Sequence, residues 1–218
     1  MVVAGRRPAP LQAVAAELAG TGTECVAIAA DVTDEAAVAA LVAETVRRFG
    51  RLDAAFNNAG FQERRAPLAE QSDDVFQRVF DTNVRAMFHA LRHQVPAMLA
   101  GGGGAIVNTA SVSGVRNPNP GLSLYSASKA AAISLTRSAA MEYAPLGVRI
   151  NAVAPGRVVT DMMLASGIAD MAAVAAALPL RRMGRPEEVA AAVAWLLSDA
   201  AGYVVGHVLC ADGGFLAA

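Results

Sequence analysis

No apolar run in the 218-residue sequence approaches the roughly 20 residues that a membrane-spanning helix needs. Charged residues make up only 17% of the chain, and the formal net charge is −1. That balance gives no reason to expect nucleic acid or an anionic membrane surface as a partner. The two cysteines, Cys25 and Cys210, form no C-x-x-C pair, so we expect buried free thiols in a cytoplasmic protein.

The sequence also lacks a glycine-rich phosphate loop in the right context. "GTGTEC" at 20–25 follows a helical pattern and precedes a strand, the reverse of what phosphate binding requires. "GGGG" at 101–104 has no Gly-Lys-Ser/Thr after it. His89 and His93 have the spacing of two metal ligands on a helix, but no third ligand is evident, so we expect no metal site.

A regular alternation of short β-rich runs and helical patterns fills the chain instead. This alternation is typical of right-handed βαβ units and predicts an α/β protein with a parallel sheet covered by helices on both faces. No linker or repeat divides the chain, so residues 1–218 form one predicted domain. The predicted strands are 1–4, 25–29, 52–57, 105–109, 148–153 and 204–209, and the predicted helices are 8–19, 34–49, 72–99, 124–144 and 186–198.

Polar side chains and glycine turns come directly after three of these strands. Ser111 comes after the run at 105–109, "NNAG" occupies 57–60, and Pro155 and Gly156 come after the run at 148–153. Ligands of open parallel sheets bind beyond the carboxyl ends of the strands. Tyr125 and Lys129 are four residues apart at a helix start and therefore share one face of that helix. We expect these groups to converge on one edge of the sheet.

Eight motifs in fixed order make the chain resemble the short-chain dehydrogenase/reductase family. The resemblance implies a Rossmann-like three-layer sandwich and an oxidoreductase that interconverts a secondary alcohol and a ketone by hydride transfer with a nicotinamide cofactor. The motifs are "DVTD" (31–34), "NNAG" (57–60), "TNV" (82–84), "NTASVSG" (108–114), "YSASK" (125–129), "NAVAPGRVVT" (151–160), "GRPEEVA" (184–190) and "ADGG" (211–214).

The resemblance also implies catalytic roles for four residues. Tyr125 would be the general acid/base, and Ser111 would hydrogen-bond the substrate oxygen. Lys129 would bind the cofactor ribose, and Asn83 would hold a water in a proton relay. Ser113 stays an alternative to Ser111; the motif favours Ser111 if the loop at 116–121 absorbs one extra residue.

The pairing of Tyr125 with Lys129 has an electrostatic rationale. A free tyrosine has a pKa of about 10, too high for a base at neutral pH. An ammonium about 4 Å away, at an effective dielectric constant of about 20, supplies about 4 kcal/mol, enough to bring that pKa to about 7. We therefore expect Lys129 to lower the pKa of Tyr125.

The end of the first predicted strand indicates the coenzyme. Relatives that use NAD place an acid there for the ribose 2′-hydroxyl, whereas this chain has Gly5, Arg6 and Arg7. Guanidinium groups suit a 2′-phosphate, so we favour NADP over NAD; solvated turn arginines are the alternative. The resemblance assigns the other cofactor contacts to Asp31, Val32, Asn58, Ala59, Gly60, Tyr125, Lys129, Pro155, Gly156, Val158 and Thr160.

The family's first strand and its T-G-x-x-x-G-x-G turn have no counterpart in this sequence. That βα unit would anchor the pyrophosphate and would lie between the strand at 1–4 and the strand at 52–57. Without it we expect a gap of about 10 Å, a strand that slides across, or a borrowed strand. Either Met1 is a misplaced start, which we favour because the catalytic residues are intact, or the chain is a truncated, inactive remnant.

The sequence gives fewer signals for the substrate and for the oligomeric state than for the catalytic residues. The segment 157–180 should form a lid over a small-molecule alcohol or ketone, and Met162, Met163 and Leu164 make that lid apolar. By the resemblance we expect a homotetramer or homodimer, paired through the helices at 72–99 and 124–144 and the C-terminal strand. The alternative to an enzyme is a catalytically inactive chain that only folds or assembles with partners.

Overall fold

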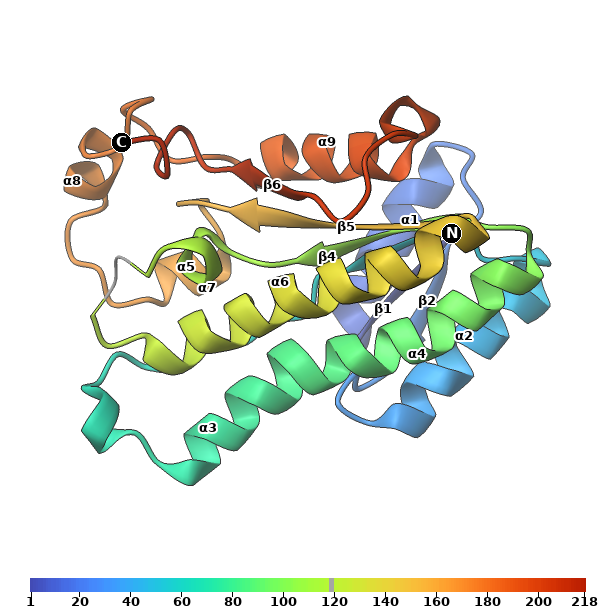
Figure 1. Ribbon diagram of the computed structural model, residues 1–218, viewed down its shortest axis with the longest axis horizontal. Helices are drawn as coiled ribbons and strands as arrows, with labels where there is room; N and C mark the ends of the chain where they lie inside the picture. Colours follow the sequence, from blue (N-terminus) through green and yellow to red (C-terminus); the bar gives the residue numbers. More distant parts are fainter. Residues whose placement is uncertain (118–119) are drawn as a thin grey trace.

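Six parallel strands lie in the part of the chain that the computed structural model describes, residues 1–117 and 120–218 (Figure 1). Four of them pair in the order β3-β4-β5-β6, and β1 and β2 pair only with each other. Every pairing is parallel, which confirms the predicted α/β class. The strands are β1 (Val2–Gly5), β2 (Val26–Ala29), β3 (Ala54–Asn57), β4 (Gly104–Thr109), β5 (Val148–Pro155) and β6 (Val208–Ala211).

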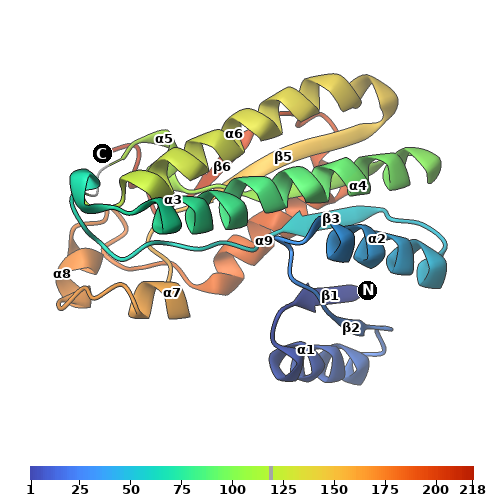
Figure 2. The same cartoon turned by 90° about the horizontal axis from the view of Figure 1, so that it is seen from below.

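Helices cover both faces of the four-stranded sheet (Figure 2). α6 and α4 lie on one face, α9 packs on β4 and β5 from the other, and α2 packs against α4. α1 packs on the β1–β2 pair. The long helices are α1 (Pro8–Gly20), α2 (Glu35–Phe49), α3 (Asp73–Phe80), α4 (Ala86–Ala100), α6 (Ser123–Tyr143) and α9 (Pro186–Leu197). The short ones are α5 (Val112–Val115), α7 (Asp161–Leu164), α8 (Met171–Ala176), η1 (Leu68–Glu70), η3 (Ala144–Leu146) and η4 (Asp199–Ala201).

The hydrophobic core is centred on β4 and β5. Ile106 and Ile150 are fully buried toward α4 and α6, while Val107 and Val153 are fully buried toward α9. Successive side chains of a strand point to opposite faces, so a strand between two helical layers must be apolar at every position. This burial holds the carboxyl ends of β4 and β5 in fixed relative positions.

The predicted helix at 72–99 is interrupted. α3 and α4 are joined by one π-helical turn, η2 (Asp81–Arg85), whose wider spacing was not expected from the sequence. Such single π-turns are frequent at functional sites because they place a side chain that a regular α-helix would point elsewhere. Here the turn contains Asn83, which is 1% exposed.

Asp34 caps α2: its carboxylate accepts from the Ala36 N–H at 2.9 Å, while the Thr33 hydroxyl donates to Asp31 at 2.8 Å. Two local predictions need correction. The last strand begins at Val208, because residues 204–207 pair with no neighbouring strand in a regular ladder. The two cysteines are free, but Cys25 is only partly buried and Cys210 is exposed.

The β1–β2 pair and the four-stranded sheet are separate. Within the described residues no strand lies between β1 and β3, so the structure leaves the expected gap open instead of closing it by a sliding strand (Figure 2). The side chains of β1 and β2 are at best partly buried, and α1, all of which is described, has no fully buried residue. This unit therefore contributes little to the hydrophobic core.

Candidate active site

The carboxyl end of β4 leads directly into the candidate active site. Ser111 is the N-cap of α5, and its hydroxyl accepts a hydrogen bond from the Ser113 N–H at 3.1 Å. The Ser111 hydroxyl also hydrogen-bonds the side chain of Tyr125. Ser111 is therefore the serine beside the tyrosine, and Ser113 contributes its backbone. Part of the loop that was expected to absorb an extra residue, at 118–119, lies outside the described residues.

The pKa of Tyr125 differs in direction from the sequence-based expectation. Burial raises the pKa of this phenol, the hydrogen bond from Ser111 lowers it, and the negative charge of Glu63 raises it further. The net effect is a raised pKa, so the prediction that Lys129 brings it down is wrong for this arrangement. The physical reason is that desolvation of a phenolate outweighs one hydrogen bond.

Lys129 is directed at the backbone of β4 instead of the phenol oxygen. Its Nζ donates to the carbonyl of Thr109 at 2.8 Å and lies 5.8 Å from the centre of the Tyr125 ring. The residue is 3% exposed, and burial lowers the pKa of its ammonium to about 8. A Cβ built on Gly60 would lie 3.6 Å from Nζ, so the glycine turn after β3 approaches the lysine closely.

Asn83 connects that turn to α6. Its amide donates to the carbonyl of Phe61 at 2.8 Å and to the hydroxyl of Ser128 at 2.9 Å, and its side-chain oxygen accepts from the Phe61 N–H at 2.8 Å. Both amide hydrogens are thereby used inside the protein. A water held by this residue must bind its remaining oxygen lone pairs or its main chain.

Glu63 is a site residue that the sequence reasoning missed. It is 3% exposed, and its two carboxylate oxygens lie 3.0 and 3.1 Å from the backbone N of Tyr125, which donates to them. Tyr125 is the third residue of α6, so the carboxylate binds an N–H of the first turn that no helical carbonyl can reach. The one available signal was an acid six residues after the Asn57 that ends β3, which is too common a pattern to single out.

A second network of side-chain amides, from β4 and α4, holds the "NNAG" turn (57–60) in place. Asn57 donates to Asn108 of the neighbouring strand at 2.9 Å and exchanges hydrogen bonds with Gln94 of α4 at 3.0 and 2.8 Å. The next residue, Asn58, accepts from the Thr109 hydroxyl at 3.0 Å. Asn58, Ala59 and Gly60 are therefore held at the carboxyl end of β4, where Lys129 also binds.

The predicted contacts after β5 lie on the same edge of the sheet. Pro155 ends β5, and a Cβ added at Gly156 would come within 2.7 Å of the Asp212 Cα, so only glycine fits there. Val158 pairs with Gly184 in an isolated parallel bridge, and Thr160 caps α7 by accepting from the Met163 N–H at 3.2 Å.

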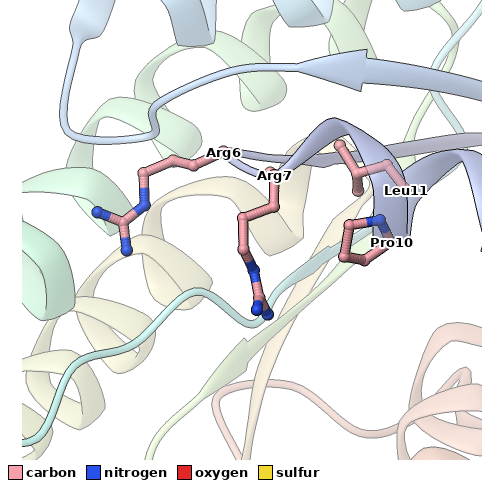
Figure 3. A pocket seen from close by; sticks show the side chains of 5 residues that line it. Arg6, Arg7, Pro10 and Leu11 are labelled. Atoms are coloured by element: carbon pink, nitrogen blue, oxygen red, sulfur yellow. The ribbon is translucent and has the colours of Figure 1, made fainter.

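Arg6 and Arg7 line a pocket of about 460 Å³ at the end of β1, together with Gly5, Pro10 and Leu11 (Figure 3). Both guanidinium groups extend away from the start of α1. Asp31 belongs to the same edge, because Ala30 donates to the Gly5 carbonyl at 2.9 Å. Two hydrogen bonds from Thr33, with a smaller effect of Arg6, hold the pKa of Asp31 below its usual value. Val32 comes next, in the turn before α2.

These residues fit the adenosine side of a dinucleotide: the pocket is open, cationic and next to a carboxylate that can accept from a base or ribose. On the nicotinamide side, Lys129, Asn58 and Gly60 converge at the end of β4. The structure does not bring the two sides together through hydrogen-bonded strands, because β1 and β3 belong to different sheets. No group of three metal-ligating side chains occurs in the described part of the chain, and no helix there is long and apolar enough to cross a membrane.

Comparisons with known proteins agree with this geometry. Residues 1–216 match the family described as enoyl-(acyl carrier protein) reductase. The chain is 46% identical, over 94% of its length and 82% of the relative's, to cis-4-hydroxycyclohexanecarboxylate dehydrogenase of Sinomonas cyclohexanicum.

Two solved structures are similar over almost the whole chain. A crystal structure of levodione reductase has a TM-score of 0.94 and 37% identity, covering 100% of this chain and 88% of that one. A crystal structure of NAD⁺-bound xylitol dehydrogenase has a TM-score of 0.90 and 33% identity, covering 98% and 88%. The chain belongs to the short-chain dehydrogenase/reductase family and is an oxidoreductase of the type that interconverts alcohols and ketones.

Proposed function

We propose that this chain oxidises or forms a secondary alcohol on a six-membered ring, with NADP as coenzyme. The observation that carries the proposal is the contact of Ser111 with Tyr125 at the end of β4, next to the buried ammonium of Lys129. A bound nicotinamide ring supplies the hydride acceptor or donor.

Residues of this chain would accept and transfer the proton of the substrate hydroxyl. In the oxidative direction the substrate hydroxyl gives its proton to the Tyr125 oxygen as the carbon gives up its hydride. Ser111 donates a hydrogen bond to the substrate oxygen and holds it in line with the phenol. Lys129 binds the ribose, and Asn83 holds a water that relays the proton onward.

NADP is favoured by the charge at the end of β1. Arg6 and Arg7 line the pocket there, and a guanidinium binds a 2′-phosphate in two-point fashion. Gly5 occupies the position at which relatives that use NAD place an acid to bind the ribose 2′-hydroxyl. The relative with bound NAD⁺ makes NAD the alternative coenzyme. The other cofactor contacts in this proposal are Asp31, Val32, Asn58, Ala59, Gly60, Pro155, Gly156, Val158 and Thr160.

The cyclic substrate is proposed from the relative named for a hydroxycyclohexanecarboxylate. An apolar cover would come from the segment 157–180 within the single domain 1–218. There α7 presents Met162 and Leu164, which are 39% and 61% exposed and so available to pack on a ring. We propose further that the enzyme works in the cytoplasm as a homotetramer or homodimer. A strand and glycine turn preceding Met1 stay a prediction.

The test is a kinetic assay of purified chain with cyclohexanol and cyclohexanone derivatives, following NADPH and then NADH by absorbance. Tyr125→Phe should lower kcat by about 100- to 10,000-fold, because the proton donor and acceptor is lost. Tyr203→Phe is the matched control, since Tyr203 is fully exposed and far along the chain from the site. A Tyr125→Phe enzyme with full activity would contradict the proposed mechanism.

A chain that only folds or assembles is the second candidate, and the open edge between β1 and β3 favours it. It predicts no coenzyme binding. Calorimetric titration with NADPH and then NADH separates the two: micromolar affinity supports the enzyme, and a folded sample without binding supports the second candidate.

A further inference from the structure

The helix that carries Tyr125 and Lys129, α6, begins at a residue that cannot cap it. Its N-cap is Leu122, which has no side-chain acceptor, and the first turn, all of which is described, contains no acidic residue. By contrast, the N-cap side chains of α2 and α3, Asp34 and Ser72, each accept from a backbone N–H of their own helix. The first N–H groups of a helix find no helical carbonyl, so those of α6 need acceptors from another part of the chain or from solvent.

Glu63 supplies such an acceptor from 62 residues away along the chain. Its two carboxylate oxygens lie 3.0 and 3.1 Å from the backbone nitrogen of Tyr125, whose N–H donates to them. Tyr125 is the third residue of α6, and the third N–H is one that a local cap would bind. The negative charge at this end also interacts favourably with the helix dipole. Glu63 is 3% exposed, so water competes little for the contact.

Two further hydrogen bonds join the same loop to the residues before α6. Arg65 donates to the carbonyl of Pro120 at 3.0 Å, and the Ala66 N–H donates to the carbonyl of Gly121 at 3.2 Å. A Cβ added at Gly121 would lie 3.2 Å from the Ala66 nitrogen, so the two segments pass each other at backbone distance. The loop after β3 therefore holds the start of α6 through one buried carboxylate and two hydrogen bonds to main-chain carbonyls.

This loop starts at the turn that we assign to the nicotinamide side of the coenzyme. Glu63 is the third residue after Gly60. Between them, the backbone of Phe61 donates to and accepts from the side chain of Asn83, at 2.8 Å in both cases. Because the loop is fixed at Phe61, the carboxylate of Glu63 links the position of Tyr125 to the position of the turn.

We propose that Glu63 is a positioning residue for catalysis: it takes the place of a local N-cap on α6 and so holds the Tyr125 phenol beside Ser111. This inference rests on the proposed function, because it assigns the proton transfer to Tyr125. Without the acceptor the first turn of α6 frays, and a displacement of about 1 Å at a reacting group costs about 100-fold in rate. The effect should fall on kcat, since the change moves the proton acceptor and removes no binding contact.

Two substitutions of nearly equal size separate position from charge. Glu63→Gln removes the charge but keeps an oxygen that accepts from the Tyr125 N–H, whereas Glu63→Met removes both. At a pH above the acid limb of the profile, Glu63→Met should lower kcat by about 10- to 100-fold and change the KM for the coenzyme by less than about 3-fold. Glu63→Gln should restore kcat to within about 3-fold of the unaltered chain, because the acceptor is back in place.

Glu70→Met is the matched control, because Glu70 is an exposed acid of η1 in the same loop and should leave kcat unchanged. A folded Glu63→Met enzyme with the kcat of the unaltered chain, or a Glu63→Gln enzyme as slow as Glu63→Met, would overturn the positioning role. If Glu63→Met does not fold, Glu63→Asp decides. Its carboxylate is one methylene shorter and keeps the charge without the contact, so kcat should fall by about 10- to 100-fold again.

Titration of the phenol distinguishes failure of this inference from failure of the proposed function. NMR of isotopically labelled tyrosine follows Tyr125 without any turnover, and Tyr125→Phe assigns its signal. Glu63→Gln and Glu63→Met both lack the charge, so a difference between them reports the hydrogen bond with Ser111, which lowers the pKa of the phenol.

A phenol that titrates at higher pH in Glu63→Met than in Glu63→Gln supports the positioning role. If that difference occurs in a chain that turns over no alcohol, the positioning role stands and the oxidoreductase is refuted. Identical titrations in a chain with normal turnover keep the oxidoreductase and refute the positioning role.

Discussion

At the scale of single residues, burial, one hydrogen bond and one negative charge set the pKa of Tyr125. Ser111 favours the phenolate, whereas burial and Glu63 favour the neutral phenol. Lys129, with a pKa lowered to about 8, is charged at neutral pH but bonded to Thr109. Ser111 and Glu63 both act on the phenol, so exchanging either of them should change the pH at which the tyrosine gives up its proton.

Glu63→Gln should shift the pH profile of alcohol oxidation to lower pH. Glutamine keeps an oxygen that accepts from the Tyr125 N–H, but it removes the negative charge that raises the pKa of the phenol. A lower pKa makes the basic phenolate available at lower pH, so the acid limb of the kcat profile shifts to lower pH. Glu70→Gln, an exposed acid of η1 near the same loop, should leave the profile in place. A profile that is unchanged or moves up in Glu63→Gln would contradict this charge effect.

At the scale of elements, the site depends on where the strands end and on the turns that continue from them. Gly156 is the sharpest case, because the segment after β5 passes the C-terminal segment at backbone distance. The amide N–H of Gly156 also donates to the carbonyl of Ala211, the last residue of β6, at 3.0 Å. The spacing between these two strand ends thus requires a residue without a side chain.

Gly156→Ala should lower the free energy of unfolding by about 1–3 kcal/mol, as expected for an atom forced into a packed site. The added Cβ would meet the Cα and Cβ of Asp212 at 2.7 and 2.8 Å, and backbone has to move to relieve that contact. Urea unfolding monitored by circular dichroism measures the change. Gly184→Ala is the control, since its Cβ would meet Val158 at 3.5 Å, an ordinary contact. An equal effect of the two substitutions would refute the steric argument.

Elements with strong local signals were predictable from the sequence. The buried runs of β4 and β5, the Pro186 that opens α9 and the convergence of Ser111 with Tyr125 and Lys129 were all expected. The π-turn at Asn83 was not, because helical periodicity does not register one extra residue in a turn. Glu63 and the pKa of Tyr125 were missed or wrong because both depend on burial and on a long-range contact, which no local pattern encodes.

At the scale of the whole molecule, buried side chains are unevenly distributed between the two sheets. The four-stranded sheet has fully buried side chains on both faces, whereas β1, β2 and α1, each described along its full length, form a unit with no fully buried side chain. The proposed coenzyme pocket at Arg6 and Arg7 belongs to that second unit, while the catalytic residues belong to the first. We therefore expect the proposed coenzyme pocket and the catalytic residues to lie on parts of different stability.

Hydrogen exchange should reveal this division directly. Amides of β1 and β2 should exchange at least about 100-fold faster than those of β4 and β5, because opening the smaller unit exposes little apolar surface. Mass spectrometry of peptides covering each strand, over seconds to days, gives the comparison within one sample. Uniform protection of all six strands would show that the two sheets unfold together and would contradict the prediction.

The unpaired edges of β1 and β3 also affect how readily copies of the protein associate in solution. In the described strands each of these sides presents a row of amide and carbonyl groups that pair with no neighbouring strand, and Phe56 on β3 is 41% exposed. Such a side is a template on which another extended chain can continue the sheet. We therefore expect copies of the protein to associate first at these two strands as its concentration rises.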